Sequence, residues 1–580
     1  MIAALRISCP GAKEIVMVNR MIRVGALVSG ACGRNGARRG LFGVFSALVL
    51  TGTVVLPVAA PAEAATHPSA DVVAGARALP DTGFVVAARS TCDVYVAPGG
   101  VDSPARGSAV APLAHLSYAM GRLTAGRVVC LAAGIYSDNY AVSAASGTAT
   151  APIVVRAVPG AASRPVLRLS ATKAALWINH GYWLIDGIEF DLSARPVSGL
   201  VIYDGAHHVV LRNSVVRNGG GGAGVYVSGD DVAVESNEIG NMFKYVNGVL
   251  DDAHGVLIEA GSARVRVSGN RIHNNSGDGI QCEYYGAPTD PAAPVDVTIQ
   301  DNRFWTDPAN YGRVEQGIDI KSCRQVSIRG SVSPDVNDPT AANQKFYGFA
   351  NTAGGRGGGA IVLHNGARNI LVENNRVWAS CFGATFGDYD RSFPDTQSIV
   401  IRRNVMFNLS AAGGGGCGRA IFAQRAQYVD VYHNTIDNIP GDAVAFGTSN
   451  GVPSAPIGDF DFWNNAVRNA GTFIRLSTGS VTQFASDNNL FYRSDGSNSR
   501  FILNGTAKTL AGWQQSANGA SLVLADGRSR VVDPLFIPGA GSTDDYYTQT
   551  GSPARDTALP NTGARVAGAG PDIGFRETYP

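Results

Sequence analysis

Polar side chains with catalytic potential are concentrated on a few consecutive strand-like segments in the middle of the chain. Each segment follows a glycine and alternates with apolar residues, as in Gly279-Ile280-Gln281-Cys282-Glu283 and Gly317-Ile318-Asp319-Ile320-Lys321. Residues two apart on a strand share a face, so the polar set faces outward while the apolar set faces a core. The candidates are His254, Glu259, Asp278, Gln281, Glu283, Asp319, Lys321 and His364, with Tyr226 on a neighbouring segment.

These residue types suit the cleavage of a uronate polymer by β-elimination. That reaction needs a cation beside the C6 carboxylate, a base for the C5 proton and a donor to the leaving oxygen. We predict Lys321 as the general base, with Asp319, Asp278 and His254 as further catalytic residues. Asp278, Asp319 and Glu283 could hold Ca²⁺, which prefers carboxylate oxygens. The predicted substrate-binding residues are Glu259, Gln281, Glu283, His364 and Tyr226.

A recurrent sequence motif explains how these segments come together. An apolar-polar-apolar run ending in Asn returns about every thirty residues, for example Val265-Arg266-Val267-Ser268-Gly269-Asn270 and Val297-Thr298-Ile299-Gln300-Asp301-Asn302. Short strands with this period and no helical pattern between them indicate a solenoid, with neighbouring coils about 4.8 Å apart. We expect the Asn of each motif, including Asn213 and Asn237, to adopt the left-handed αL backbone and to hydrogen-bond to its neighbour one coil away.

The unequal spacing of the coils predicts where loops project. Long insertions flank the charged segments, and we expect them to form the walls of a groove beside the candidate residues. Because Lys321 lies in an outward column, we expect Lys321→Ala to leave thermal unfolding nearly unchanged. The insertions are Met242–Ala253, Tyr284–Val295, Trp305–Glu315, Pro334–Gly357 and Phe386–Gln397.

Composition narrows the possible partners. Charged residues make up 16% of the 580 residues and the net charge is +1, so no electrostatic argument favours nucleic acid. The 71 glycines suit tightly turning coils. We therefore expect an anionic partner, here an acidic polysaccharide, to bind to local groups of charged residues. We expect a monomer.

The N-terminal region reads as an export signal. Arginines precede an apolar stretch from Leu41 to about Val58, and Ala62-Glu63-Ala64 has a small-x-small cleavage pattern. We therefore expect a secreted or periplasmic protein, cleaved near Ala64 and without a membrane anchor afterwards. Six cysteines remain beyond this region, and in an exported chain they predict disulfides. Pairing in sequence order joins neighbouring coils and gives Cys92–Cys130, Cys282–Cys323 and Cys381–Cys417.

Both ends of the chain resemble a known group. The segment from Cys92 to Leu131, with Asp93-Val94-Tyr95-Val96-Ala97-Pro98-Gly99-Gly100 and a helix expected from about Ala111 to Leu123, resembles the N-terminal cap of bacterial pectate-lyase-like β-helix proteins. Asp533-Pro534-Leu535-Phe536 and Gly551-Ser552-Pro553-Ala554-Arg555-Asp556 resemble C-terminal motifs of the same group. The resemblance implies an all-β, right-handed parallel β-helix, and some of its members are Ca²⁺-dependent lyases with a Lys base. The paired-Asp strand typical of their calcium sites is absent here.

The expected organisation has one main domain. Residues 1–64 form a signal region, 65–91 a linker, 92–150 an N-terminal cap, 151–495 the parallel β-helix, and 496–580 a C-terminal cap and tail. The leading functional prediction is a secreted polysaccharide lyase on an acidic glycan. A polygalacturonase-type glycoside hydrolase using only carboxylates, an epimerase, and a non-catalytic carbohydrate-binding β-helix remain alternatives.

Overall fold

A computed structural model describes residues 91–137, 140–169, 173–330, 345–349, 358–387, 395–411, 417–447, 457–477, 479–519, 524–537, 546–560 and 568–577. The chain divides into two units, Met1–Ala65 and Thr66–Pro580, and all of the described residues belong to the second. The predicted signal region and most of the predicted linker lie outside the described residues. Among the described residues, none of the helices has both the length and the apolar character needed to cross a bilayer.

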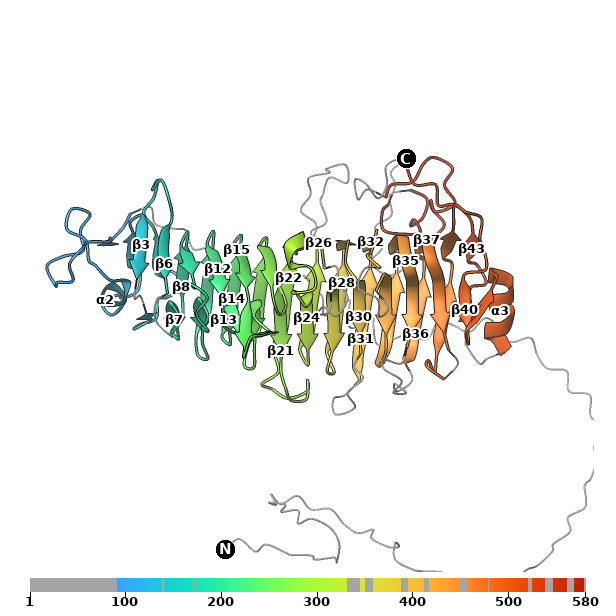
Figure 1. Ribbon diagram of the computed structural model, residues 1–580, viewed down its shortest axis with the longest axis horizontal. Helices are drawn as coiled ribbons and strands as arrows, with labels where there is room; N and C mark the ends of the chain where they lie inside the picture. The colour runs from blue at the N-terminus through green and yellow to red at the C-terminus, as the bar shows by residue number, and fades with distance from the viewer. Residues whose placement is uncertain are drawn as a thin grey trace, which may run out of the picture. The chain divides into compact units, whose positions relative to one another are not determined.

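The fold is a right-handed parallel β-helix, as the sequence predicts. Successive coils contribute strands to three rows, and each strand pairs in parallel with its equivalents in the coils before and after it (Figure 1). The first row forms a sheet of 15 described strands. They are β1 (Val94–Val96), β2 (Val128–Leu131), β5 (Ile153–Ala157), β8 (Trp183–Asp186), β11 (His207–Arg212), β14 (Asp230–Glu235), β19 (Ala263–Ser268), β22 (Val295–Gln300), β25 (Arg324–Arg329), β28 (Arg368–Glu373), β31 (Thr396–Arg402), β34 (Ala426–Tyr432), β36 (Gly458–Trp463), β38 (Phe484–Asp487) and β42 (Leu524–Ala525).

The second row follows the Asn-bearing turn of each coil. Its strands are β3 (Gly134–Ser137), β6 (Pro165–Arg168), β9 (Glu189–Asp191), β12 (Val215–Gly219), β15 (Glu238–Met242), β20 (Arg271–Asn275), β23 (Arg303–Trp305), β26 (Lys345–Tyr347), β29 (Arg376–Trp378), β32 (Val405–Phe407), the first parts of β35 (Thr435–Phe446) and β37 (Ala466–Leu476), β39 (Leu490–Tyr492) and β43 (Arg530–Val531).

The third row carries the candidate site. Its strands are β4 (Ala141–Val142), β7 (Leu176–Ile178), β10 (Leu200–Ile202), β13 (Ala223–Val227), β18 (His254–Ile258), β21 (Ile280–Glu283), β24 (Gln316–Lys321), β27 (Gly359–His364), β30 (Phe382–Phe386), β33 (Arg419–Ala423), the later parts of β35 and β37, and β40 (Phe501–Leu503). Because β35 and β37 run unbroken from the second row into the third, these rows join as one sheet, which also includes β41 (Thr506–Lys508), antiparallel to β40.

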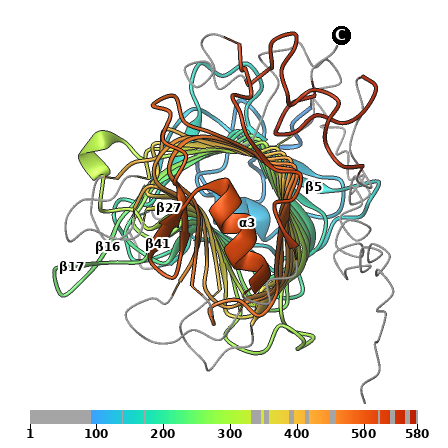
Figure 2. The ribbon, with the colours of Figure 1, turned by 90° about the vertical axis from the view of Figure 1, so that its right-hand side faces the viewer.

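Both ends of the stack are covered by a helix. At the N-terminal end, α2 (Leu116–Met120) is shorter than the helix expected from the sequence, and it buries Leu116 and Met120 against the core. At the other end, α3 (Leu510–Gly519) lies across the last coil (Figure 2), with Trp513 fully buried. The caps exclude water from apolar side chains that a further coil would otherwise cover. Parallel pairing already begins with β1 and β2, so the predicted N-terminal cap contributes strands to the β-helix itself.

An asparagine ladder holds consecutive coils together at the first turn. The backbone N–H of Asn237 donates to Oδ1 of Asn270 at 2.9 Å, and Asn270 repeats this contact with Asn302 at 2.9 Å. Each ladder Asn also donates through Nδ2 to a carbonyl of an earlier coil, as Asn302 does to Val267. A buried polar side chain is stable there because its hydrogen bonds are made within the protein. A second run of the ladder joins Asn375, Asn404, Asn434, Asn465 and Asn489.

The expected backbone conformation of the ladder Asn is wrong by one residue. The αL residue is the one before it, with φ of 54° at Ser236 and 57° at Asp301, whereas Asn237 and Asn302 do not have positive φ. Asn213 corresponds to Ser236 and not to Asn237, since it has φ 51° and Ser214 N–H donates to Oδ1 of Asn237. The turn needs αL backbone at one position and an inward-pointing amide at the next. The sequence motif alone does not show which of the two consecutive residues meets each requirement.

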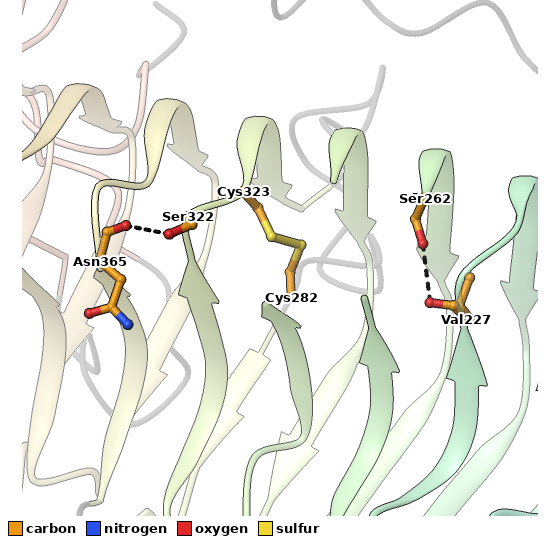
Figure 3. Close-up of a disulfide and its surroundings, with 6 residues drawn as sticks. All are labelled: Val227, Ser262, Cys282, Ser322, Cys323 and Asn365. Carbon is orange, nitrogen blue, oxygen red and sulfur yellow. Dashed lines mark hydrogen bonds between the residues drawn. A yellow bond between two sulfur atoms is a disulfide. The ribbon is translucent and has the colours of Figure 1, made fainter. Parts of the chain in front are cut away.

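All three predicted disulfides are present. The Cα–Cα distances are 5.6 Å for Cys92–Cys130, 6.3 Å for Cys282–Cys323 and 4.4 Å for Cys381–Cys417. The middle bridge joins Cys282 on β21 to Cys323 just after β24 (Figure 3), and the chain between them contains two of the insertions. In the preceding coils the same corner is held by a hydrogen bond from Ser262 Oγ to the Val227 carbonyl at 3.1 Å. Three disulfides indicate an extracellular or periplasmic protein.

Candidate functional site on the third strand row

The register of the third row brings the predicted residues into adjacent columns. Leu257 pairs with Gln281 and Gln281 with Asp319, while Glu283 pairs with Lys321 and Lys321 with His364. The inward neighbours are apolar and fully buried, as Ile318 and Ile320 illustrate. Core packing of these inward side chains thus fixes which polar side chains face outward. We call the set His254, Asp278, Gln281, Glu283, Asp319, Lys321 and His364 the polar patch.

Asp319 is the centre of the polar patch. Its Oδ2 lies 3.1 Å from Nζ of Lys321 on the same strand, and its Oδ1 lies 2.8 Å from Nε2 of His364 on the next coil. The Asp319 side chain is 5% exposed, whereas those of Lys321 and His364 are 20% and 21% exposed. A substrate on this face would therefore meet Lys321 and His364 first, with Asp319 orienting both from beneath.

The ion pair determines the charge of both partners. Burial raises the pKa of Asp319, but the opposing effects of His364 and Lys321 are larger together and hold the pKa well below its usual range. Burial lowers the pKa of Lys321, yet the Asp319 and Asp278 carboxyls bring it above the usual value for lysine. These shifts favour the ammonium form of Lys321 and the carboxylate form of Asp319.

Asp278 and His254 form a second buried pair beside this centre. Oδ2 of Asp278 lies 3.2 Å from Nδ1 of His254 and accepts a hydrogen bond from Nε2 of Gln281 at 3.0 Å. The backbone N–H of Asp278 donates to the same His254 Nδ1 at 3.0 Å, which assigns the imidazole proton to Nε2. Oδ1 of Asp278 is buried and has no hydrogen-bond partner among the residues that the structure describes.

Burial shifts the pKa values of this second pair toward the uncharged forms. It raises the pKa of Asp278 well above the usual range, with the nearby Asp319 carboxylate adding to the effect. Burial also lowers the pKa of His254. Asp278 and Asp319 have opposite pKa shifts although they lie on neighbouring coils, because Asp319 is in direct contact with Lys321 and His364.

Tyr226 and Glu259 lie at the N-terminal edge of the polar patch. The Tyr226 hydroxyl donates to Oε2 of Glu259 at 2.8 Å, and burial followed by this bond raises the pKa of Tyr226. Tyr285 was not predicted from the sequence. It is 77% exposed on the insertion after β21. The pKa of Tyr285 is raised by partial burial, then by Glu283 and Glu259, while Lys321 acts in the opposite direction. The sequence signal that could have identified Tyr285 is its position directly after Glu283 and Tyr284.

Most of the polar patch is buried, although the sequence places its residues in outward columns. Asp278 is fully buried, and His254, Gln281, Glu283 and Asp319 are between 2% and 8% exposed. Strand alternation decides only which side of the sheet a residue faces, and neighbouring loops decide whether water reaches it. Removal of these residues is consequently expected to affect stability as well as function.

Three of the five insertions, Met242–Ala253, Tyr284–Val295 and Trp305–Glu315, lie wholly within the described residues. Met242–Ala253 contains the antiparallel hairpin of β16 (Lys244–Val246) and β17 (Val249–Asp251), and Trp305–Glu315 contains a 3-10 turn, η1 (Pro308–Asn310). Nη2 of Arg313 donates to the Tyr245 hydroxyl at 2.6 Å, so these two insertions contact each other. Much of Pro334–Gly357 and Phe386–Gln397 lies outside the described residues, and the groove stays a prediction.

Two of the three predicted calcium ligands contact other side chains. Both oxygens of Asp319 contact Lys321 or His364, and Oδ2 of Asp278 contacts His254 and Gln281. Within the described ranges there is no group of three or more His, Cys, Asp or Glu residues that could hold a metal ion. This donor set does not fit Ca²⁺ as it is arranged here, so no chemical step below depends on calcium, which stays a prediction from the sequence.

Comparison with known families gives the class of the fold. Residues 94–352 match the family model described as "Pel9A-like, right handed beta helix region". This range includes β1 to β26 and every residue of the polar patch except His364. The chain thus contains a Pel9A-like right-handed β-helix region, and the resemblance to pectate-lyase-like proteins is confirmed.

Solved structures with this fold include enzymes of more than one class. Pectate lyase Pel9A is 16% identical, with 84% of this chain and 98% of that chain covered and a TM-score of 0.38. The alginate lyase AlyF-OU02 in complex with G6 is 11% identical, with 75% and 88% covered and a TM-score of 0.47. The GH87 α-1,3-glucanase catalytic unit from Streptomyces thermodiastaticus strain HF3-3 is 14% identical, with 63% of each chain covered and a TM-score of 0.40. These similarities concern the fold and carry no argument about activity. Among curated proteins, no sequence matches.

Proposed function

We propose that this protein is a polysaccharide lyase that cleaves an acidic, uronate-containing glycan at the polar patch. The observation that carries the proposal is the Lys321–Asp319–His364 arrangement, with two cationic or proton-exchanging groups at the surface on one buried carboxylate. A fixed ammonium can stabilise the negative charge that develops on a uronate during proton abstraction. Preorganisation by Asp319 means that this charge need not be assembled during the reaction.

The geometry supports a division of roles between Lys321 and His364. The sequence alone suggested Lys321 as the base, but its raised pKa favours an ammonium that neutralises the C6 carboxylate and gives a proton to the leaving oxygen. An imidazole can take a proton near neutral pH, so we assign abstraction of the C5 proton to His364. In this scheme the C5–H electrons form the C4–C5 double bond, and the C4–O bond breaks with its electrons on the leaving oxygen. Asp319 positions both groups, and Glu283, Glu259, Gln281 and Tyr226 are proposed to contact the substrate.

One observation favours a second candidate, a glycoside hydrolase. The pKa of Asp278 is raised and that of Asp319 is lowered, and a pair of carboxyls with opposite pKa shifts is what general-acid hydrolysis of a glycosidic bond requires. Against this, Asp278 is fully buried and Asp319 nearly so, whereas the more exposed groups are Lys321 and His364. We therefore rank hydrolysis second.

A product assay on acidic and neutral polysaccharides separates the candidates. A lyase yields an unsaturated uronate that absorbs in the ultraviolet, while a hydrolase yields reducing ends without that absorbance. Parallel reactions with a chelator and with added Ca²⁺ test the calcium prediction. Binding without either product would indicate a carbohydrate-binding protein and contradict the proposal.

A further inference from the structure

Two arginines that have no carboxylate partner among the described residues lie side by side just beyond the polar patch. Arg324 begins β25 and Arg368 begins β28, and the parallel register pairs them directly on adjacent coils. Parallel neighbours with like charge repel each other, and Arg324 contributes to the lowered pKa of Arg368, second to burial. Folding has therefore placed two cations together, and among the described residues neither has the carboxylate partner that other arginines of this sheet have.

Several other arginines of the first row form an ion pair with a carboxylate. Arg212 contacts Asp186 at 3.0 Å, and Arg402 contacts Glu373 at 2.9 Å. For Arg324 and Arg368, by contrast, the described part of the chain provides no ion pair and no side-chain hydrogen bond, and both Nε atoms are buried without a partner. The carboxylate one coil earlier and one residue along, Asp296, forms no ion pair with either of them within that same part of the chain. A buried guanidinium N–H without an acceptor is costly.

The position of the pair relates it to the polar patch. Arg324 follows Lys321 by three residues, and Arg368 follows His364 by four, each around the same corner of the same coil. Three residues of extended chain span at most about 11 Å. The disulfide Cys282–Cys323 and the hydrogen bond from Ser322 Oγ to the Asn365 carbonyl at 2.5 Å hold this corner rigidly (Figure 3).

We propose that Arg324 and Arg368 form an oxyanion site that binds a carboxylate or sulfate group of an acidic glycan. Two guanidinium groups on neighbouring coils offer the planar, bidentate donors that carboxylates and sulfate-like oxyanions accept. The glycan assignment rests on the proposed function, because a polymer with a charge on successive residues reaches both the polar patch and this pair. The anion assignment itself does not depend on catalysis.

Calorimetric titration of the full chain with sodium sulfate, at ionic strength held constant with chloride, tests the anion site. We expect saturable binding that weakens about tenfold or more in Arg368→Gln and in Arg324→Gln, since charge-assisted hydrogen bonds are lost. The matched control is Arg303→Gln, an exposed arginine on the second row, which should bind sulfate like the unchanged protein. Unchanged affinity in the double variant, or no saturable binding at all, would overturn the site.

Two oligosaccharide probes identify the source of the anion. Trigalacturonate tests a carboxylate and a sulfated trisaccharide of neutral sugars tests a sulfate ester, each against the same variants. Arginine-dependent binding of either supports the glycan assignment and names the group, whereas arginine-independent binding of both overturns it. If no polysaccharide is cleaved but sulfate binding depends on the pair, the lyase proposal fails and the anion site stands.

Discussion

Nζ of Lys321 lies 3.1 Å from Oδ2 of Asp319, a carboxylate with only 5% of its side chain exposed. Under the proposed function the pair links catalysis to stability, because the ammonium that a substrate would meet also compensates a charge that is almost fully buried. Replacing Lys321 therefore has two separable consequences.

Lys321→Ala is expected to lower turnover by about 10²–10⁴-fold if Lys321 exchanges a proton with the substrate. It should also lower the free energy of unfolding by about 3 kcal/mol, because the buried Asp319 carboxylate loses a partner. Activity assays and urea unfolding measure the two effects. In Lys321→Ala/Asp319→Asn the uncompensated charge is gone, so stability should recover while activity should not. Full activity in Lys321→Ala would contradict the assigned role.

Removing the asparagine ladder at one coil is expected to destabilise the protein strongly. Asn434 accepts from the Asn404 backbone N–H at 2.9 Å and donates to the Ile401 carbonyl at 2.9 Å. Asn434→Ala leaves these buried groups unpaired and should cost about 3 kcal/mol in denaturant unfolding. Asn213→Gly is the matched control. Asn213 ends the same sequence motif but is exposed and has a φ of 51°, a backbone conformation that glycine adopts readily. Equal losses in the two variants would show that the ladder is not the cause.

Replacing the disulfide of the site coil should lower stability without changing the fold. The Cys282–Cys323 bridge closes a loop with a sequence separation of 41, and a loop of this length corresponds to about 4 kcal/mol in the chain-entropy model. In Cys282→Val/Cys323→Ser, valine suits the inward column and serine can donate as Ser262 does, which should make the loss smaller. Thermal unfolding with and without reductant checks this, as the double variant should no longer respond to reduction of this bridge.

Acidification should destabilise the contact between the coils and the C-terminal segment at His433. Nδ1 of His433 donates to the Asp572 carbonyl at 2.9 Å, and burial, with Arg403 nearby, lowers the pKa of His433 to about 4. A histidine whose pKa is lowered on folding contributes full stability above the unfolded value of about 6.5 and loses it as pH falls toward 4.

The comparison of unfolding free energies at pH 7 and pH 5 in the protein and in His433→Asn measures this contribution. Asparagine suits the positive φ of 53° at this position, which Asn464 and Asn488 occupy in other coils. The variant should lose less stability between the two pH values than the unchanged protein. An identical pH dependence would show that other groups titrate instead.

The sequence by itself was sufficient for the coil architecture and its register. Period-two alternation with a thirty-residue repeat allows one set of side chains to be buried, so Ile318 and Ile320 could be assigned inward and Asp319 and Lys321 outward. The same stacking placed Gln281 beside Asp319 and Lys321 beside His364. The disulfides followed because cysteines on consecutive coils are brought within bonding distance whenever the register is correct.

Other features depended on contacts that no periodic pattern encodes. Asp278 is fully buried although it faces outward, and its pKa moves opposite to that of Asp319 because only Asp319 touches Lys321 and His364. The turn required αL at Ser236 and not at Asn237 because the Asn side chain must point inward to its neighbour. The juxtaposition of Arg324 and Arg368 likewise arises from the pairing of β25 with β28, which are more than forty residues apart along the chain. Alternation fixes the side of a sheet on which a residue lies, whereas burial and charge depend on what the rest of the fold places beside it.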